Sequence, residues 1–253
     1  MFPYYPYVPG PALAEGTELV AITRDPGEAA PAPVGDAIVA DPRLALEALV
    51  AAVEASDRPA PEPPPPLGPP EQSDPISPGG VHATLADVLS DDAIVVLESP
   101  SSTLALRSRL RISRPGSYFF GAGGGLGFGL AAGIGVQLAQ PGRPVVCVLG
   151  EGSAQYAITG FWTAAAYGVP VTFLVLNNSE YSILKWFAGM EGVQGAPGLD
   201  LPALDTAGVA AAYGVPARRV DGADELRDAL QRAVASDGPE LIEVRTLAGM
   251  SLF

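Results

Sequence analysis

The chain has 253 residues, of which 48% are hydrophobic and 17% are charged, a composition that excludes intrinsic disorder for its bulk. Its net charge of −14 and the lack of a basic patch exclude a nucleic-acid-binding protein. The single cysteine, Cys147, excludes a disulfide framework and a cysteine zinc site, fits a reducing cytoplasmic location, and is expected to be a small core residue.

The first block, residues 1–58, is interpreted as a fragment of a Rossmann-like domain. Short apolar segments at 20–23 and 36–40 predict buried strands. Asp41 is a candidate N-cap for an Ala- and Leu-rich helix that continues to about Ala55. Two strands and one helix cannot enclose a core, so we expect this block to belong to a larger domain.

Residues 59–80 are rich in proline, including four consecutive prolines at 63–66. This composition favours an extended polyproline conformation and predicts a linker between domains. A proline-rich interaction motif is the alternative.

From residue 81 onward, apolar segments alternate with helical ones. The predicted strands are 94–97, 145–149, 171–176 and 241–244, and the predicted helices are 81–90, 125–139, 154–167, 206–213 and 223–236. Unbroken apolar strands indicate a parallel sheet that is covered on both faces. The predicted fold class is therefore α/β, a doubly wound parallel sheet, preceded by the partial Rossmann-like segment.

Residues 119–139 form a charge-free stretch of 21 residues, which is nominally long enough to span a bilayer. Eight of these residues are glycine, and each glycine costs a helix roughly 1 kcal/mol relative to alanine. We therefore interpret the stretch as a glycine-rich turn that leads into a core helix, with a membrane span as the alternative. The first six residues also lack the basic start and the apolar run of a signal peptide.

Polar residues follow two of the predicted strands at the point where each strand ends. Gly150-Glu151-Gly152-Ser153 follows one strand and Asn177-Asn178 follows the next, so that Asn178 lies 27 residues after Glu151. Doubly wound sheets bind ligands outside the carboxyl ends of their strands. Glycine lets a ligand approach the backbone, and carboxylate and amide oxygens suit magnesium. An ordinary glycine turn and an ordinary Asn-Asn loop are the alternatives for each motif alone.

Together the two motifs resemble the cofactor motif of thiamine diphosphate-dependent enzymes, in which Gly-Asp-Gly precedes Asn-Asn. Other segments are similar to decarboxylases of the benzoylformate decarboxylase type, namely 34–41, 115–120, 124–128, 161–165 and Trp186-Phe187. Such enzymes have an N-terminal pyrimidine-binding domain, a middle domain and a C-terminal diphosphate-binding domain. The resemblance implies that 1–58 is the end of the middle domain, that 59–80 is a linker, and that 81–253 is the thiamine diphosphate-binding domain.

The resemblance also implies roles for individual residues. Magnesium would be bound by Glu151, the Asn178 side chain and the backbone oxygen of Glu180. The cofactor's diphosphate would be contacted by Gly152, Ser153, Tyr181 and Ser182, with a further contact from Ser101. Two residues would serve catalysis directly, the carbonyl of Gly124 by binding the aminopyrimidine and Leu126 by enforcing a bent cofactor. The substrate pocket would be lined by Phe120, Ile183, Leu184 and Phe187, for which core packing is the alternative.

The sequence departs from the family pattern at three places. Glu151 replaces the usual aspartate, Ile183 replaces a small residue in the substrate pocket, and Tyr4 or Tyr5 stands where a histidine is usual. His82, the only histidine, is expected on an exposed helix face without a role.

The pyrimidine-binding domain carries the family's catalytic glutamate, and this chain does not match that domain. The resemblance therefore implies the magnesium- and diphosphate-binding subunit of a split 2-oxo acid decarboxylase or carboligase. Its expected partners are a second subunit with the pyrimidine-binding domain, in a heteromer with two copies of each chain, and a small 2-oxo acid or aldehyde, but no nucleic acid and no membrane. The alternatives are an acetolactate-synthase-like carboligase subunit and a non-catalytic structural subunit.

Overall fold

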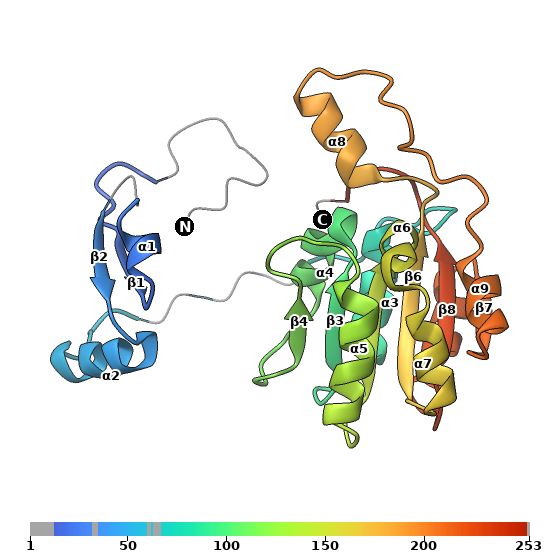
Figure 1. Ribbon diagram of the computed structural model, residues 1–253, viewed down its shortest axis with the longest axis horizontal. Helices are drawn as coiled ribbons and strands as arrows, with labels where there is room; N and C mark the ends of the chain where they lie inside the picture. The colour runs from blue at the N-terminus through green and yellow to red at the C-terminus, as the bar shows by residue number, and fades with distance from the viewer. Residues whose placement is uncertain (1–12, 32–34, 60–61, 63–66, 252–253) are drawn as a thin grey trace. The chain divides into compact units, whose positions relative to one another are not determined.

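The structure, a computed structural model, describes residues 13–31, 35–59, 62 and 67–251 (Figure 1). The chain divides into two compact units, residues 1–64 and residues 65–253, and the division falls in the proline-rich segment interpreted as a linker. Tyr4 and Tyr5 lie outside the described residues. Within those ranges no helix is both long enough and apolar enough to cross a membrane.

The first unit contains a two-stranded parallel sheet and two helices. Strand β1 (Val20–Thr23) pairs with β2 (Asp36–Val39), and the helices are α1 (Pro26–Ala29) and α2 (Pro42–Ala52). The predicted cap is confirmed, because the Asp41 carboxylate accepts hydrogen bonds from the first-turn N–H groups of α2 at 2.9 and 3.2 Å.

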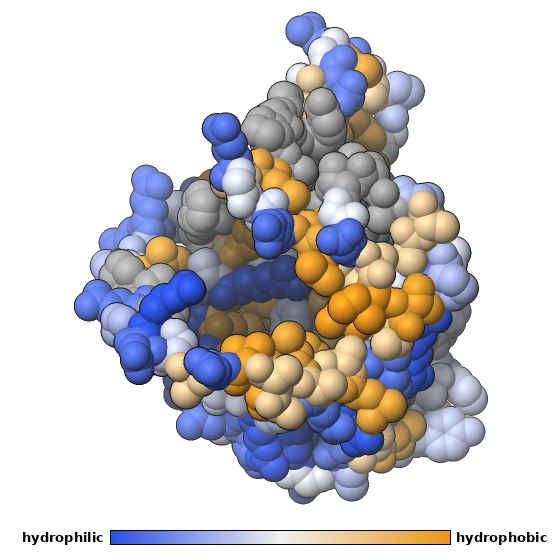
Figure 2. Space-filling view, turned by 90° about the vertical axis from the view of Figure 1, so that its left-hand side faces the viewer, coloured by the Kyte–Doolittle hydropathy of each residue, from blue (hydrophilic) through white to orange (hydrophobic). Residues whose placement is uncertain are grey.

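Nothing in these four elements is buried, so the prediction of buried strands is wrong for this unit taken by itself. Val39 is 54% exposed on β2, and Leu44 is 57% exposed on α2. The face of the molecule drawn in Figure 2 carries hydrophobic side chains among hydrophilic ones. Two short strands and two helices have too little surface to cover both faces of a parallel sheet.

The second unit is built on a six-stranded sheet in the order β4-β3-β5-β6-β8-β7, and every pair of neighbouring strands is parallel. Its strands are β3 (Ile94–Glu98), β4 (Tyr118–Phe120), β5 (Val145–Gly150), β6 (Val171–Asn177), β7 (Ala217–Val220) and β8 (Glu240–Arg245).

Helices cover both faces of this sheet (Figure 1). One face packs against α5 (Phe128–Ala139), α7 (Gly160–Ala166) and α9 (Thr206–Ala212), and the other packs against α3 (Pro78–Val88), α4 (Thr103–Arg109) and α10 (Ala223–Ala233). The side chains of β3 alternate between the two cores, with Ile94 and Val96 in one and Val95 and Leu97 in the other. The doubly wound α/β fold is thus confirmed.

Two features of the second unit differ from the sequence prediction. Strands β4 and β7 and helices α4 and α8 (Ser182–Met190) were not predicted. The helix predicted over 154–167 is divided into α6 (Glu151–Ala154), a 3-10 turn at Gln155–Ala157, and α7. The charge-free stretch 119–139 contains the end of β4, a turn, and the whole of α5. It is therefore not one continuous helix that could span a membrane.

The strand order reverses between β3 and β5, because β4 lies on one side of β3 and β5 on the other. In open parallel sheets such a reversal leaves a crevice at the carboxyl ends of the strands, where ligands bind. The carboxyl ends of β3, β5, β6 and β8 meet at this edge, and α8 lies beyond it at the top of Figure 1.

Candidate functional site

A pocket lies at the carboxyl edge of the sheet, between the segments that follow β3, β5, β6 and β8. It brings together most of the predicted site residues, namely Ser101, Leu126, Glu151, Gly152, Ser153, Asn178, Glu180, Tyr181, Ser182 and Ile183. It is also lined by Gly150 of the first motif and by six residues that sequence reasoning did not single out, namely Pro78, Ser99, Pro100, Ser102, Leu176 and Thr246. Several of these follow strand ends, so the same topological argument could have found them.

Glu151 is the buried carboxylate of the pocket, with 2% of its surface exposed. It is the first residue of α6, and its Oε1 accepts hydrogen bonds from the backbone N–H groups of Asn178 at 3.1 Å and Glu180 at 3.3 Å. Burial raises the pKa of this carboxyl above its usual value, although the backbone N–H groups act in the opposite direction. The two predicted motifs are therefore in direct contact.

The residues after β6 form a hydrogen-bonded network beside Glu151. Asn178 Nδ2 donates to Ser182 Oγ at 2.7 Å, and Ser182 Oγ donates to Glu180 Oε1 at 2.6 Å. Burial acts to raise the pKa of Glu180, but hydrogen bonds from Lys185, Ser182 and the Gly249 N–H outweigh it and lower that pKa. The Glu180 side chain is thus ionised and paired with Lys185. Its backbone oxygen remains for the predicted role in magnesium binding.

The first residue of the Asn-Asn pair has a separate function in the turn. Asn177 Nδ2 donates to the buried carboxylate of Glu243 at 2.7 Å, and Asn177 Oδ1 accepts the Ser179 N–H at 3.1 Å. Ser179 has a φ of 59°, a left-handed conformation that non-glycine residues rarely adopt. Asn177 therefore ties the turn that carries Asn178 and Glu180 to the core strand β8.

Gly152 stands where the side chains of Tyr181 and Leu201 come close. A Cβ atom at this position would lie 2.5 Å from the ring of Tyr181 and 3.0 Å from Leu201. Tyr181 N in turn donates to Leu199 O at 2.8 Å. Glycine suits this position because the Tyr181 ring from the segment after β6 packs directly onto α6, and both Gly152 and Tyr181 line the pocket.

A second buried carboxylate, Glu98, holds the segment that carries Leu126. It ends β3 and accepts hydrogen bonds from the N–H groups of Gly127, Phe128 (3.3 Å) and Gly129 (2.7 Å) at the start of α5. Burial raises the pKa of Glu98 as well, against the effect of these N–H groups. Leu126 consequently enters the pocket from a segment fixed to the end of a core strand.

Four predicted site residues do not line the pocket: Gly124, Phe120, Leu184 and Phe187. Phe120 is 47% exposed on β4, and the Arg107 guanidinium lies 5.0 Å from its ring centre. Leu184 is 45% exposed on α8, and the Phe187 ring packs edge-on against Trp186 at 4.9 Å. Ile183 is the only residue of the predicted substrate group that this pocket includes.

The expectation that His82 lies on an exposed helix face is wrong. His82 is fully buried on α3, and its Nε2 lies 2.9 Å from Ser102 Oγ, which lies 2.9 Å from Ser99 Oγ. Helix α3 is enclosed between α4 and α10, and this enclosure cannot be read from its own sequence. Cys147 is fully buried on β5, as expected.

The oxygen-rich pocket fits a magnesium diphosphate group in its chemistry. A buried carboxylate, a carboxamide and a backbone carbonyl are hard oxygen ligands of the kind that magnesium takes in small number beside phosphate oxygens and water. A cation there would also offset the cost of keeping Glu151 ionised. In the described part of the chain, no three or more His, Cys, Asp or Glu side chains cluster so that they could hold a metal ion by themselves.

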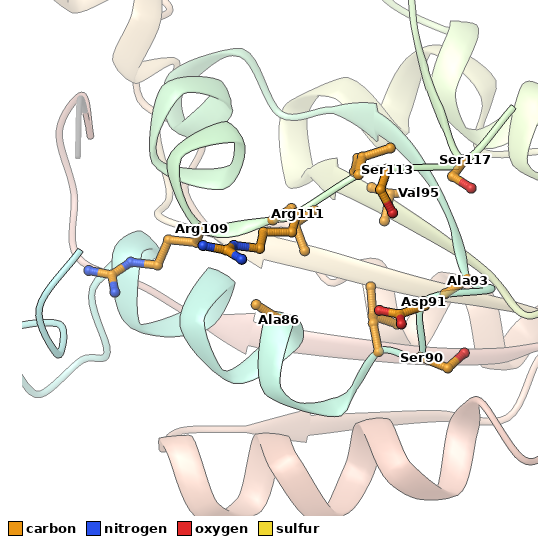
Figure 3. Close-up of a pocket in the computed structure, with 12 residues that line it drawn as sticks. Ala86, Ser90, Asp91, Ala93, Val95, Arg109, Arg111, Ser113 and Ser117 are labelled. Atoms are coloured by element: carbon orange, nitrogen blue, oxygen red, sulfur yellow. The ribbon is translucent and has the colours of Figure 1, made fainter. Parts of the chain in front are cut away.

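A second pocket lies away from these residues, at the amino-terminal ends of β3 and β4 (Figure 3). Its lining includes Ala93 and Ser117, which precede the two strands, and Arg109 and Arg111 from the segment that ends α4. None of the predicted site residues lines it.

Residues 101–244 match the family model for the thiamine pyrophosphate enzyme, C-terminal TPP binding domain. The chain is 49% identical over 249 residues to benzoylformate decarboxylase from Pseudomonas aeruginosa, a match that covers 97% of this chain and 47% of that protein. It is 28% identical over 178 residues to the acetolactate synthase isozyme 1 large subunit of Escherichia coli K12, covering 70% of this chain and 32% of that protein.

One solved structure with a similar fold is a thiamine diphosphate-dependent 4-hydroxybenzoylformate decarboxylase from Rhodococcus jostii RHA1. The TM-score is 0.90 at 43% sequence identity, and the similarity covers 99% of this chain and 48% of that chain. This chain therefore spans about half the length of the decarboxylases that it matches.

Proposed function

The chain belongs to the thiamine pyrophosphate enzymes, and on that premise we propose that it is the magnesium- and diphosphate-binding part of a 2-oxo acid decarboxylase or carboligase. Thiamine pyrophosphate is the same compound as thiamine diphosphate. One observation carries the proposal: Glu151 of the first motif contacts the backbone of Asn178 and Glu180 in the second, inside a pocket at the carboxyl edge of the sheet.

When bound, thiamine diphosphate supplies a thiazolium ring that accepts the electron pair released when a 2-oxo acid loses carbon dioxide. In our proposal, magnesium is bound by Glu151, Asn178 and the backbone oxygen of Glu180. The diphosphate is held by Gly152, Ser153, Tyr181, Ser182 and Ser101, all of which line the pocket. Leu126, fixed through Glu98, supports the cofactor from the side of α5, and Gly124 in the same loop binds the pyrimidine.

The proposed substrate is a 2-oxo acid with an aromatic or branched apolar side chain. The names of the Pseudomonas and Rhodococcus relatives specify benzoylformate and 4-hydroxybenzoylformate, which are aromatic 2-oxo acids. Ile183 supports this assignment as an apolar residue of the pocket that follows the proposed diphosphate contact Ser182 in the chain. Phe120, Leu184 and Phe187 complete the substrate site in our proposal, and a partner chain would cover them.

An acetolactate-synthase-like carboligase is the second candidate, and the similarity to the Escherichia coli enzyme favours it. Both candidates use the same pocket, and they differ in whether a second carbonyl compound or a proton captures the product of decarboxylation. A screen of 2-oxo acids in the presence and absence of an acceptor aldehyde or 2-oxo acid separates them.

The catalytic glutamate in our proposal comes from a second subunit with the pyrimidine-binding domain, in a heteromer with two copies of each chain. The exposed apolar side chains of β1, β2 and α2 support a second chain that covers them. The proposed compartment is the cytoplasm, in keeping with the single buried cysteine.

The test of the proposed site is calorimetric titration of the full chain with thiamine diphosphate in excess magnesium. Glu151→Ala removes the anionic ligand and should weaken binding at least tenfold, because losing one charge-assisted contact costs about 1.5–3 kcal/mol. Glu151→Asp retains a carboxylate and introduces the aspartate that is usual in the family. This variant should bind thiamine diphosphate as well as the unmodified chain or better. Equal affinity of all three proteins would remove Glu151 from the site and favour a structural subunit.

A further inference from the structure

Three buried polar side chains form a row that ends at the wall of the candidate pocket. His82 on α3 is fully buried, Ser102 is 1% exposed and Ser99 is 2% exposed. His82 Nε2 lies 2.9 Å from Ser102 Oγ, and Ser102 Oγ lies 2.9 Å from Ser99 Oγ. Both serines line the pocket that contains Glu151 and Asn178, whereas His82 does not reach it.

The surroundings of His82 determine which of its ring nitrogens carries the proton. Burial lowers the pKa of His82 to about 3, and the positive charge of Arg109 contributes, so the imidazole is neutral near pH 7. Nδ1 is buried and has no hydrogen-bond partner in the described part of the chain. A proton on Nδ1 would be a buried donor without an acceptor, which costs about 1–3 kcal/mol, so the proton belongs on Nε2.

The proton on Nε2 fixes the direction of the whole row. Nε2–H donates to Ser102 Oγ, and the Ser102 hydroxyl then donates to Ser99 Oγ. Among the described residues, Ser102 is the only hydrogen-bond partner of Ser99 Oγ. The hydroxyl hydrogen of Ser99 is therefore not used within the row, and Ser99 is a lining residue of the pocket.

The opposite tautomer would reverse every bond in the row. Ser102 would donate to Nε2, Ser99 would donate to Ser102, and only lone pairs of Ser99 would face the pocket. Lone pairs repel an anion, whereas a hydroxyl hydrogen attracts one. The tautomer of a histidine outside the pocket thus decides whether this wall of the pocket attracts or repels negative charge.

We propose that Ser99 is an anion-binding residue of the pocket and that His82 is the positioning residue that keeps its hydroxyl oriented as a donor. This inference rests on the proposed function, because the anion it concerns is the diphosphate group of the cofactor.

The orientation is tested directly by nitrogen-15 NMR of the full chain without ligand. His82 is the only histidine, so long-range proton–nitrogen correlations give one imidazole pattern that needs no assignment by mutation. We expect the pattern of a neutral ring protonated on Nε2 at pH 7. Protonation on Nδ1, or a charged ring, would overturn the proposal whatever the chain binds.

The consequence for binding is tested by calorimetric titration with inorganic pyrophosphate in excess magnesium. His82→Phe keeps a buried ring but removes both nitrogens. It should weaken pyrophosphate binding roughly three- to tenfold, because the hydroxyls of Ser99 and Ser102 are then no longer held in the donating orientation before binding. His82→Gln is the rescue control, since its amide nitrogen is separated from Cβ by as many bonds as Nε2 is. We expect it to bind within about twofold of the unmodified chain. Thermal unfolding of each variant checks that the fold is retained.

The double variant distinguishes positioning from a general effect on structure. Ser99→Ala should weaken binding by about tenfold, and adding His82→Phe to it should change the affinity no further, because His82 acts only through Ser99. Additive losses, or equal binding by His82→Phe and the unmodified chain, would overturn the proposal while leaving the proposed function standing. If the unmodified chain binds no pyrophosphate, the proposed function fails, and the tautomer alone decides the orientation of the row.

Discussion

At the scale of single residues, two buried carboxyl groups support the pocket: Glu151 lines it, and Glu98 holds the segment that carries Leu126. Burial raises the pKa of both carboxyl groups. The hydrogen bonds that they accept from backbone N–H groups lower the pKa, but by less than burial raises it. A raised pKa in the folded chain means that folding favours the protonated form. The two groups therefore stabilise the chain most at a pH below their unfolded pKa, near 4.5, and this contribution is lost as the pH rises through the folded pKa.

This linkage predicts that Glu151→Gln flattens the pH dependence of stability in the ligand-free chain. The amide cannot ionise, so the variant avoids the cost of a buried charge above pH 4.5 and should gain stability relative to the unmodified chain as the pH rises. Urea unfolding between pH 4.5 and 7.5 measures this difference. Glu191→Gln is the control, because Glu191 is exposed at the end of α8. A parallel pH dependence for Glu151→Gln and the unmodified chain would contradict the prediction.

At the scale of elements, the start of α5 is fixed by close contact with β3. A Cβ atom at Gly129 would lie 2.6 Å from Glu98 Cβ and 2.9 Å from Leu149. Gly127, just before the helix, has a φ of 101° and no side chain to cap α5, so the Glu98 carboxylate takes the place of the cap. The packing of this helix and the position of Leu126 thus depend on the same contact.

We predict that Gly129→Ala lowers the free energy of unfolding by about 1–3 kcal/mol, as expected when an extra methyl group is forced into a packed core. Gly135→Ala on the same helix is the matched control. Its Cβ would meet nothing within 4 Å, so the gain in helix propensity should stabilise the chain by about 0.5–1 kcal/mol. Denaturant unfolding of both variants provides the comparison. Equal effects from the two substitutions would show that β3 and α5 are not in close contact.

The strands that the sequence predicted are those with an unbroken run of apolar residues. Strands β3, β5, β6 and β8 are central or near-central, so most of their buried residues are apolar on both faces, with Glu98 and Glu243 as charged exceptions. The missed strands, β4 and β7, are the two edges of the sheet, and two arginines interrupt the apolar residues of β7. Helix α8 was missed although its apolar residues Ile183, Phe187 and Met190 have helical spacing; in the structure only Ser182 of this helix is buried.

The candidate site was predictable to the extent that topology alone places residues. Parallel strands bring their carboxyl ends to one edge, which is why Glu151 and Asn178 could be paired from their positions after two strands. The roles of Glu98, Asn177 and His82 depend on which side chain meets which backbone group across the fold, and spacing along the chain does not contain that information. Gly124, Phe120, Leu184 and Phe187 came from resemblance alone, and this pocket does not include them.

At the scale of the whole molecule, the two units differ in how much of them is buried. The sheet of the second unit has two hydrophobic cores, whereas β1, β2, α1 and α2 contain no buried residue. We predict that backbone amides of β1 and β2 exchange with solvent far faster than those of β5 and β6 in hydrogen-exchange mass spectrometry of the full chain. Burial, rather than hydrogen bonding within a sheet, sets the cost of opening, since all four strands are paired. Equal protection of both sheets would contradict this prediction and with it the proposed need for a covering chain.

The final prediction concerns the carboxylates available to the cofactor. In our proposal Glu151 binds magnesium. Glu180 is ion-paired with Lys185, and Glu98 accepts hydrogen bonds from the backbone N–H groups at the start of α5. Each carboxylate at the pocket in the described chain is therefore engaged, and none remains to activate the pyrimidine ring. The purified chain should consequently bind cofactor yet release no carbon dioxide from benzoylformate, and a co-expressed chain with the pyrimidine-binding domain should restore release. A coupled assay of carbon dioxide, with Glu151→Ala in the restored complex as the control, decides between the outcomes. Turnover by the rigorously purified chain alone would show that the activating group lies within these 253 residues and would end the split-enzyme proposal.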